Sequence, residues 1–215
     1  MISLDILSDP ICPWCLIGKT HLGRALAEAG NPFEISWHPF QLNPDMPPGG
    51  MDRRDYLEAK FGGREKAAEV YARIDEAARA AGLTIDWGAI ARTPSTLDAH
   101  RLIHWAGLER CQDAVVDALF RAYFLEGADI GDRNVLSDVA EAAGMDRSVV
   151  DRLLDGDADV EDVRRRDAHA RSRGVTGVPT FVVAERHVVP GAQPPELWRQ
   201  VIEELSGPPA GVRPS

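Results

Sequence analysis

The sequence predicts an α/β protein in which a βαβ unit and a ββα unit are separated by a long helical segment. Two patterns and the length of the chain predict this class. Alternating apolar residues, typical of half-buried strands, lie near both ends of the chain, at 2–7 and 178–183. Apolar residues at helical spacing dominate the segment between them. The 215 residues suffice for one large domain or for one domain that carries a sizeable insertion.

The N-terminal unit begins with the strand at 2–7 and continues with an amphipathic helix from Leu16 to Ala29. Asn31 and Pro32 end this helix, because proline cannot continue the helical hydrogen-bond ladder. Residues 33–37 then alternate between apolar and polar side chains as a second strand. Two strands joined by one helix within about forty residues form a βαβ unit, so we expect parallel strands and a right-handed crossover.

The middle of the chain predicts a helical insertion. The proline- and glycine-rich stretch from Pro39 to Met51 is typical of a loop that leaves the sheet. From Asp52 to about Ser172 the sequence contains no pattern typical of a strand, and glycines lie at or near the ends of the helical segments. The expected helices are 53–61, 64–81, 95–109, 111–126, 133–143, 147–154 and 159–172.

Strand patterns return near the C-terminus. Residues 178–183 and 187–189 are separated by a polar turn at Glu185 and Arg186, which predicts a hairpin. A last helix begins at Pro194 and Pro195, and one of its faces is apolar. We therefore expect a discontinuous domain of residues 1–45 and 174–206, an all-helical insertion of residues 46–173 and a flexible tail of residues 207–215.

Composition and charge limit the classes of function. The chain is 44% hydrophobic and carries a net charge of −10, which argues against nucleic acid or an anionic membrane surface as a main partner. No apolar run approaches the length that spans a bilayer, and the first residues contain Asp5 and Asp9 rather than the basic residues of a signal peptide. Three cysteines do not make a disulfide framework. We expect a cytoplasmic protein whose cysteine pair has a catalytic or redox role.

Cys12 and Cys15 form a Cys-Pro-Trp-Cys motif where the first strand gives way to the first helix. The unpaired N–H groups and the positive dipole end of a helix N-terminus favour a thiolate at Cys12, which we expect to be partly exposed. A spacing of three residues puts both cysteines on one helical face, close enough for a disulfide. Pro13 suits a first helical turn, and Trp14 either covers the site, shields the thiolate or contacts clients. The motif predicts a reversible dithiol–disulfide switch.

Further residues near the motif or on the helices allow more than one role. Asp9, three residues before the motif, is either a helix N-cap or a proton-relay group. His100 and His104 share one predicted helix, and we expect them to pack rather than to bind a metal, because no third ligand is evident. The motif itself lacks the second cysteine pair of a structural zinc site. Cys111 shares a predicted helix face with apolar residues, which is typical of an inert core thiol.

The order of these features resembles a known family. The cysteine motif lies at the first helix of a βαβ unit, and a Gly-Val-Pro-Thr segment at 177–180 begins a late strand. This layout, with helices between the two halves, resembles the thioredoxin fold of DsbA-like proteins and is most similar to their FrnE-type branch. The resemblance spans residue 2 to about residue 206 and is carried by 9–18, 39–44, 96–102, 174–181 and 191–193.

The resemblance implies a role for each residue of the motif. Cys12 is the attacking cysteine, Cys15 resolves the mixed disulfide, and Pro179 is a cis-proline that faces them. A cis bond at the start of a strand turns the backbone of Val178 toward the cysteines and leaves its N–H and C=O free to pair with an extended client segment. With Pro13 and Trp14, these two residues form the expected substrate-binding surface.

The implied activity is thiol–disulfide exchange on protein disulfides, as a reductase or isomerase or as an oxidase. The implied partners are cysteine-containing client proteins or small thiols, with glutathione as an electron partner and no cofactor beyond the redox-active disulfide. Asp9 and His100 are candidates for the lining of the cleft. The alternative is a glutathione-dependent isomerase or transferase of the 2-hydroxychromene-2-carboxylate isomerase or kappa type. Those relatives carry serine at the position of Cys12 and usually lack Cys15, so this sequence departs from them at both positions.

Overall fold

Four strands form one mixed sheet in the computed structural model, which describes residues 1–206. β1 (Ile2–Ser8) pairs with β2 (Phe33–Pro39) in parallel and with β5 (Thr180–Val183) antiparallel, and β5 pairs antiparallel with β6 (His187–Pro190). The predicted βαβ and ββα units are therefore both present and share this sheet. The tail predicted at 207–215 lies outside the described residues. In spatial order the strands are β2, β1, β5 and β6.

The helices begin and end within a few residues of their predicted bounds. The first helix begins three residues earlier than expected, at Pro13, because proline is well suited to a first helical turn. Within residues 1–206 no helix is both long and apolar enough to cross a membrane. The bounds are α1 (Pro13–Ala29), α2 (Arg53–Phe61), α3 (Arg64–Ala80), α4 (Leu97–Leu108), α5 (Gln112–Phe124), α6 (Arg133–Ala142), α7 (Arg147–Asp155), α8 (Val160–Ser172) and α9 (Pro195–Ser206).

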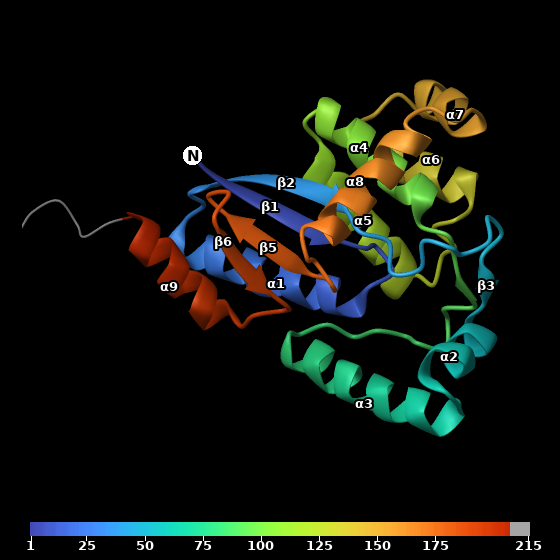
Figure 1. Ribbon diagram of the computed structural model, residues 1–215, viewed down its shortest axis with the longest axis horizontal. Coiled ribbons are helices and arrows are strands. Elements are labelled where there is room, and N and C mark those ends of the chain that lie inside the picture. Colours follow the sequence, from blue (N-terminus) through green and yellow to red (C-terminus); the bar gives the residue numbers. More distant parts are fainter. Residues whose placement is uncertain (207–215) are drawn as a thin grey trace, which may run out of the picture.

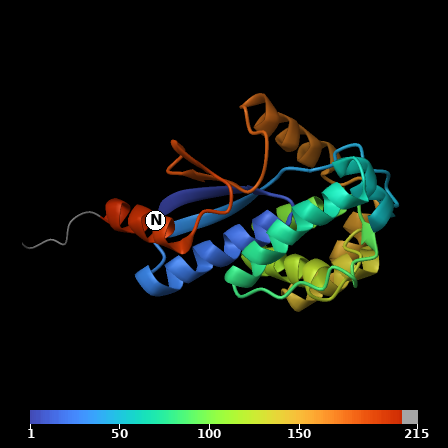
Figure 2. The ribbon, with the colours of Figure 1, turned by 90° about the horizontal axis from the view of Figure 1, so that it is seen from below.

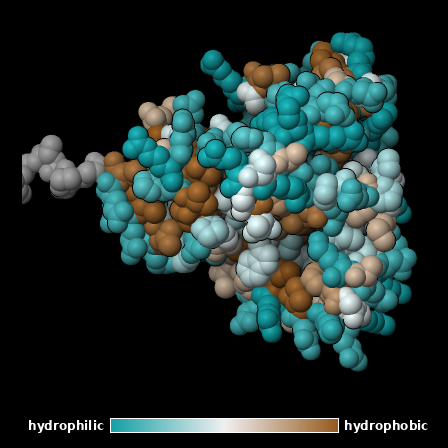
Figure 3. All heavy atoms as spheres, viewed as in Figure 1, coloured by the Kyte–Doolittle hydropathy of each residue, from teal (hydrophilic) through white to brown (hydrophobic). Residues whose placement is uncertain are grey.

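Helices α1 and α9 cover one face of the sheet (Figures 1 and 2). The alternation of the strands supplies the apolar residues of this face, since Leu4 and Ile6 of β1 are fully buried. Phe181 of β5 and Trp198 of α9 meet edge to face, with their ring centroids 4.7 Å apart. In the direction of view of Figure 1 the surface is mostly hydrophilic, and apolar side chains gather over β6 and α9 (Figure 3). The ring contact of Phe181 and Trp198 joins β5 to α9.

The insertion lies beyond the C-terminal ends of β1 and β2 (Figure 1). Helices α4, α5 and α8 contact β2, and α3 runs alongside α1 (Figure 2). Arg101 of α4 is buried and holds the helices together. Its guanidinium pairs with Asp98 and donates to the carbonyl oxygens of Ala158 and Gly156, at 2.6 and 2.7 Å. One buried cation therefore ties α4 to the connection between α7 and α8.

The prediction of an all-helical insertion is wrong in one place. β3 (Met51–Asp52) pairs antiparallel with β4 (Arg92–Thr93). Two-residue strands are too short for an alternating pattern, so no periodic signal marks them. Gly50 permits the pairing because its φ is +67° and a Cβ there would lie 2.6 Å from the carbonyl oxygen of Thr93. The division of the chain into a domain of residues 1–45 and 174–206 and an insertion stays a prediction.

Candidate active site

The cysteine motif is held in place by backbone hydrogen bonds. Cys12 is the N-cap residue of α1, and its N–H donates to the carbonyl oxygen of Asp9 at 2.9 Å. Its own carbonyl oxygen accepts the N–H of Cys15 at 3.0 Å. Both cysteines are free, and they come within 3.5 Å of each other. This separation allows a disulfide to form with little movement of the backbone.

Both cysteines are buried, so the expectation that Cys12 is partly exposed is wrong. Cys12 is 3% and Cys15 is 1% exposed, whereas Trp14 between them is 39% exposed. Burial raises the pKa of the Cys15 thiol well above its usual value, and the neighbouring Cys12 raises it further. Cys15 is therefore a thiol at neutral pH until another group takes its proton.

The loop before β5 faces the first cysteine, as the resemblance implied. The Val178–Pro179 bond is cis, which confirms the prediction. The Cys12 thiol donates to the carbonyl oxygen of Val178 with an Sγ–O distance of 3.6 Å. The expectation that this carbonyl is free is therefore wrong. The N–H of Val178 has no hydrogen-bond partner within the described part of the chain. Gly18 of α1 allows the close approach, because a Cβ there would lie 3.0 Å from Cγ of Pro179.

Asp9 lies fully buried behind the motif and joins three parts of the fold. Its carboxylate accepts the N–H of Ile11 at 3.3 Å and the N–H of Leu42 at 2.6 Å. It also accepts the hydroxyl of Thr96 at 3.5 Å. These bonds connect the turn of the motif to the segment after β2 and to the start of α4. Asp9 is therefore not the N-cap of α1, a position that Cys12 occupies.

Asp9 and His100 form a buried pair of titratable groups. Burial raises the pKa of Asp9 to about 7, although its hydrogen bonds oppose the shift. His100 is 3% exposed, and burial lowers its pKa to about 4. Its Nε2 lies 4.0 Å from Oδ1 of Asp9 and has no hydrogen-bond partner among the described residues. Between the pKa values of about 4 and about 7 both groups are uncharged, so the contact is not an ion pair in slightly acidic solution.

Two other predicted residues lie away from the cysteine pair. Nδ1 of His104 is 3.1 Å from Nη1 of Arg166, so His104 faces α8. Within residues 1–206 no three His, Cys, Asp or Glu side chains are placed to hold a metal ion. Cys111 is the half-buried N-cap residue that precedes α5, which corrects the prediction of a buried core thiol within the helix. Burial and the charge of Glu109 raise the pKa of its thiol.

Sequence analysis did not single out Arg53, the first residue of α2. Arg53 is 7% exposed and donates to the hydroxyl oxygens of Tyr71 and Tyr123, at 2.7 and 2.8 Å. Burial raises the pKa of Tyr71, against the charge of Arg53, and the charges of Tyr56 and Cys12 raise it further. Nothing in the sequence indicates that an arginine in the first turn of a polar helix is buried. Only the packing of the helices shows this cluster.

Comparisons with known proteins identify the family of the chain. Residues 3–203 match the family described as DSBA-like thioredoxin domain. The uncharacterized protein YwbO of Bacillus subtilis (strain 168) is 27% identical over 205 residues, which cover 94% of this chain and 96% of that protein. The crystal structure of a probable DsbA oxidoreductase from Streptomyces coelicolor superposes with a TM-score of 0.84 at 30% identity, and covers 100% of this chain and 94% of its own.

Two more distant structures share the fold. The cytosolic disulfide reductase DsbM from Pseudomonas aeruginosa has a TM-score of 0.69 at 20% identity, over 95% of this chain and 98% of its own. A 2-hydroxychromene-2-carboxylate isomerase has a TM-score of 0.72 at 17% identity, over 95% of this chain and 96% of its own. The family as a whole supports thiol–disulfide oxidoreductase chemistry. The chain belongs to the family of DsbA-like thioredoxin domains.

Proposed function

We propose that this protein exchanges protein disulfides through Cys12 and Cys15. One observation carries the proposal: Cys12 stands at the N-terminus of α1, between the Cys15 side chain and the carbonyl oxygen of Val178. The helix N-terminus stabilises a thiolate. The unpaired N–H of Val178 is suited to an extended client segment beside the attacking sulfur.

The dithiol and the client disulfide together account for every bond and electron of the exchange. The Cys12 thiolate attacks one sulfur of a client disulfide, so a Cys12–client bond forms while the client S–S bond breaks. The departing client sulfur leaves as a thiolate and takes up a proton. Cys15 then loses its proton and attacks Sγ of Cys12, which releases the second client sulfur and leaves a Cys12–Cys15 disulfide. Two electrons have passed from the protein to the client.

A thiol must return these electrons before the next cycle. We assign this step to a small thiol such as glutathione, two molecules of which reduce the Cys12–Cys15 disulfide and leave as one disulfide. One of the structural neighbours, DsbM, was solved with glutathione. The proposal includes a cytoplasmic location, where a reducing thiol pool keeps the pair as a dithiol and favours reduction or isomerisation.

Trapping of the mixed disulfide tests the proposal. Cys15→Ser lacks the resolving thiol, so we expect it to accumulate a covalent adduct with a scrambled disulfide protein or with insulin. Non-reducing electrophoresis and mass spectrometry of the cross-linked peptide report the adduct and its attachment to Cys12. Dithiothreitol is expected to release it. Cys111→Ala serves as the control, because Cys111 lies outside the motif and its loss is expected to leave the reaction unchanged.

The glutathione-dependent isomerase is the competing outcome. An enzyme of that type needs bound glutathione but no internal disulfide, so it tolerates Cys15→Ser and forms no client adduct. Wild-type protein that leaves protein disulfides intact, yet isomerises an aromatic carboxylate when glutathione is added, would replace our proposal with this alternative.

A further inference from the structure

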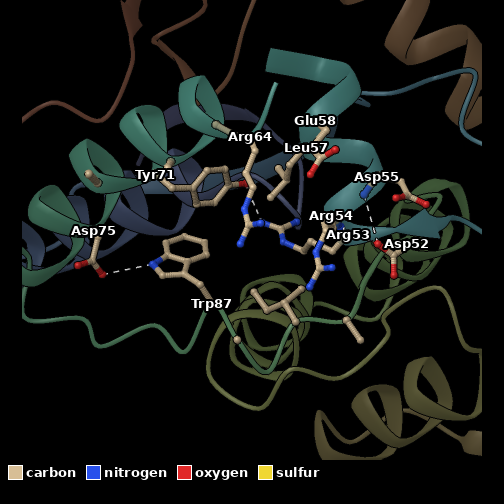
Figure 4. A pocket seen from close by; sticks show the side chains of 16 residues that line it. Asp52, Arg53, Arg54, Asp55, Leu57, Glu58, Arg64, Tyr71, Asp75 and Trp87 are labelled. Atoms are coloured by element: carbon tan, nitrogen blue, oxygen red, sulfur yellow. Dashed lines mark hydrogen bonds between the residues drawn. The ribbon is translucent and has the colours of Figure 1, made fainter. Parts of the chain in front are cut away.

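A cavity of about 940 Å³ opens in the insertion between α2, α3 and the segment 86–91. Its volume lies within the range of small-molecule sites. Its walls combine aromatic rings with the guanidinium groups of Arg53, Arg54 and Arg64 (Figure 4). We call it the arginine cavity. The cysteine motif does not line it, and no step of the disulfide exchange described above uses it.

Three guanidinium groups point into the arginine cavity from two helices (Figure 4). Arg53 is fixed by the hydroxyls of Tyr71 and Tyr123 and is almost fully buried. The side chains of Arg54 and Arg64 make no hydrogen bond or ion pair with any described residue. A buried, immobile cation beside two unpaired ones is an arrangement that attracts an oxyanion, because each guanidinium offers a planar fork of donors.

No carboxylate among the described residues forms an ion pair with these three arginines. The protein carries a net charge of −10, and arginines elsewhere, such as Arg79 and Arg199, do pair with carboxylates. Four carboxylates also line the cavity. Asp52 accepts two backbone N–H groups of α2, and Asp75 accepts the indole N–H of Trp87.

The two remaining carboxylates belong to Asp55 and Glu58 of α2, and neither forms an ion pair among the described residues. Asp55 lies with Asp52 at the end of the view that is away from the rings of Tyr71 and Trp87 (Figure 4). The guanidinium groups lie nearer to those rings. Asp75 lies beside Trp87 on the aromatic side, where the indole N–H and Arg79 engage its carboxylate. The unpaired guanidinium groups of Arg54 and Arg64 therefore stay open to another anion.

The aromatic wall provides a flat apolar surface beside the cations. The rings of Tyr71 and Trp87 meet edge to face, with their centroids 4.8 Å apart. Because the hydroxyl of Tyr71 and the indole N–H of Trp87 are both engaged, the rings present mainly carbon to the cavity. Such a wall accepts the carbon skeleton that carries an anionic group.

One wall of the arginine cavity belongs to a helix that packs against the helix of the cysteine motif. Helix α3, which carries Arg64 and Tyr71, packs against α1, which carries the cysteine motif. Burial raises the pKa of Tyr71, and the charge of Cys12 adds a smaller increase. A ligand whose sulfur reacts at Cys12 can thus extend toward α3 with its remaining atoms.

We infer that the arginine cavity binds a carboxylate of the thiol or disulfide that reacts at Cys12, through the guanidinium groups of Arg54 and Arg64 over the fixed Arg53. This inference rests on the proposed exchange reaction and adds to it a selectivity for acidic substrates. The carboxylate belongs either to a small acidic thiol or to an acidic side chain near a client cysteine. Both sources share the chemistry that the cavity recognises.

Binding of unreactive thioethers tests the inference without any disulfide chemistry. One arm compares 2-(methylthio)benzoate with its neutral amide. The other compares two short peptides that contain S-methylcysteine and differ by Glu or Gln near it. In titration calorimetry at low salt we expect the acid of at least one pair to bind about tenfold more tightly than its amide. Added salt weakens this preference, because screening acts on the exposed arginines.

Three variants locate the effect. We expect Arg54→Gln and Arg64→Gln each to reduce the preference for the acid severalfold. Arg73→Gln, on the same helix as Arg64 but outside the cavity and also unpaired, is expected to keep it. A preference in the benzoate pair alone identifies a small acidic thiol as the ligand, and one in the peptide pair alone identifies an acidic client.

Equal binding of acid and amide in both arms would refute the inference, as would a preference that survives in both cavity variants. These results do not depend on exchange activity. A protein that binds the acids but leaves every disulfide intact would therefore contradict the proposed function and its link to the cavity, while the carboxylate site would remain.

Discussion

The redox centre and the arginine cavity differ in how their side chains are held. The redox centre consists of Cys12, Cys15 and Asp9, which are at most 3% exposed and are bonded to the backbone or to each other. In the arginine cavity, Arg54 and Arg64 are exposed, and their side chains bond to no described residue. The difference corresponds to two proposed roles, reaction and recognition. In the proposed function the reacting groups are held by burial, whereas recognition of the ligand belongs to charged side chains that keep their contact with water.

The largest expected effect follows the removal of the attacking sulfur. Cys12→Ala deletes the nucleophile, so we expect the turnover of an insulin or scrambled-protein disulfide to fall at least about a thousandfold. Stopped assays of released thiols measure it. Equal turnover by Cys12→Ala and by the wild type would show that the nucleophile lies elsewhere. Cys111→Ala would then test Cys111 first.

A glycine pair on α1 tests how rigid the redox centre is. Gly18→Ala places a methyl group 3.0 Å from Pro179 and 3.3 Å from Phe181, so we expect it to lower the free energy of unfolding by about 1–3 kcal/mol. Gly23→Ala, on the same helix, meets no atom within 4 Å. It is expected to raise the free energy of unfolding by about 0.5–1 kcal/mol, since alanine favours a helix interior. Urea denaturation distinguishes the two, and equal effects would contradict the close approach.

The buried pair Asp9 and His100 predicts two opposing dependences of stability on pH. Folding raises the pKa of Asp9 from 3.8 to about 7, so the folded protein keeps a proton that the unfolded chain has lost, and this contribution to stability decreases as pH rises. Folding lowers the pKa of His100 from 6.5 to about 4, so its contribution increases as pH rises. Between pH 4 and 6.5 the two largely cancel.

Single substitutions remove the cancellation. Asp9→Asn is expected to make the slope of unfolding free energy against pH more positive, and His100→Gln to make it more negative. Each change approaches at most about 1.4 kcal/mol per pH unit, the value for one proton. Urea midpoints at pH 4.5, 5.5 and 6.5 measure both slopes relative to wild type. Slopes that change in the same direction in both variants would show that the assigned shifts are wrong.

The smallest expected effect belongs to the arginine cavity. Arg54→Gln breaks no hydrogen bond of its side chain, so the free energy of unfolding should change by less than about 0.5 kcal/mol. Urea denaturation beside Arg73→Gln, a matched surface arginine, measures it. A loss of more than about 1 kcal/mol would show that Arg54 stabilises the fold and would remove the contrast between the two regions.

Much of the fold could be predicted because its signals are local. The predicted helix at 53–61 coincides with α2, and most other bounds differ by one to three residues. Apolar periodicity and helix-ending glycines act over a few residues, and the sequence contains them directly. The β3–β4 pair was missed because two residues have no period, and its partners lie forty residues apart.

The sequence by itself determined the order of strands and helices and the position of the Cys12–Cys15 motif at the start of α1. The cis Val178–Pro179 bond was expected only through family resemblance. The tertiary structure alone decided that Cys12 is buried, that Asp9 bonds to residues 33 and 87 positions away, and that Arg53 is buried against two tyrosines. The physical reason is that burial and pKa depend on atoms that remote elements bring within a few ångströms, and no periodicity along the chain records those distances.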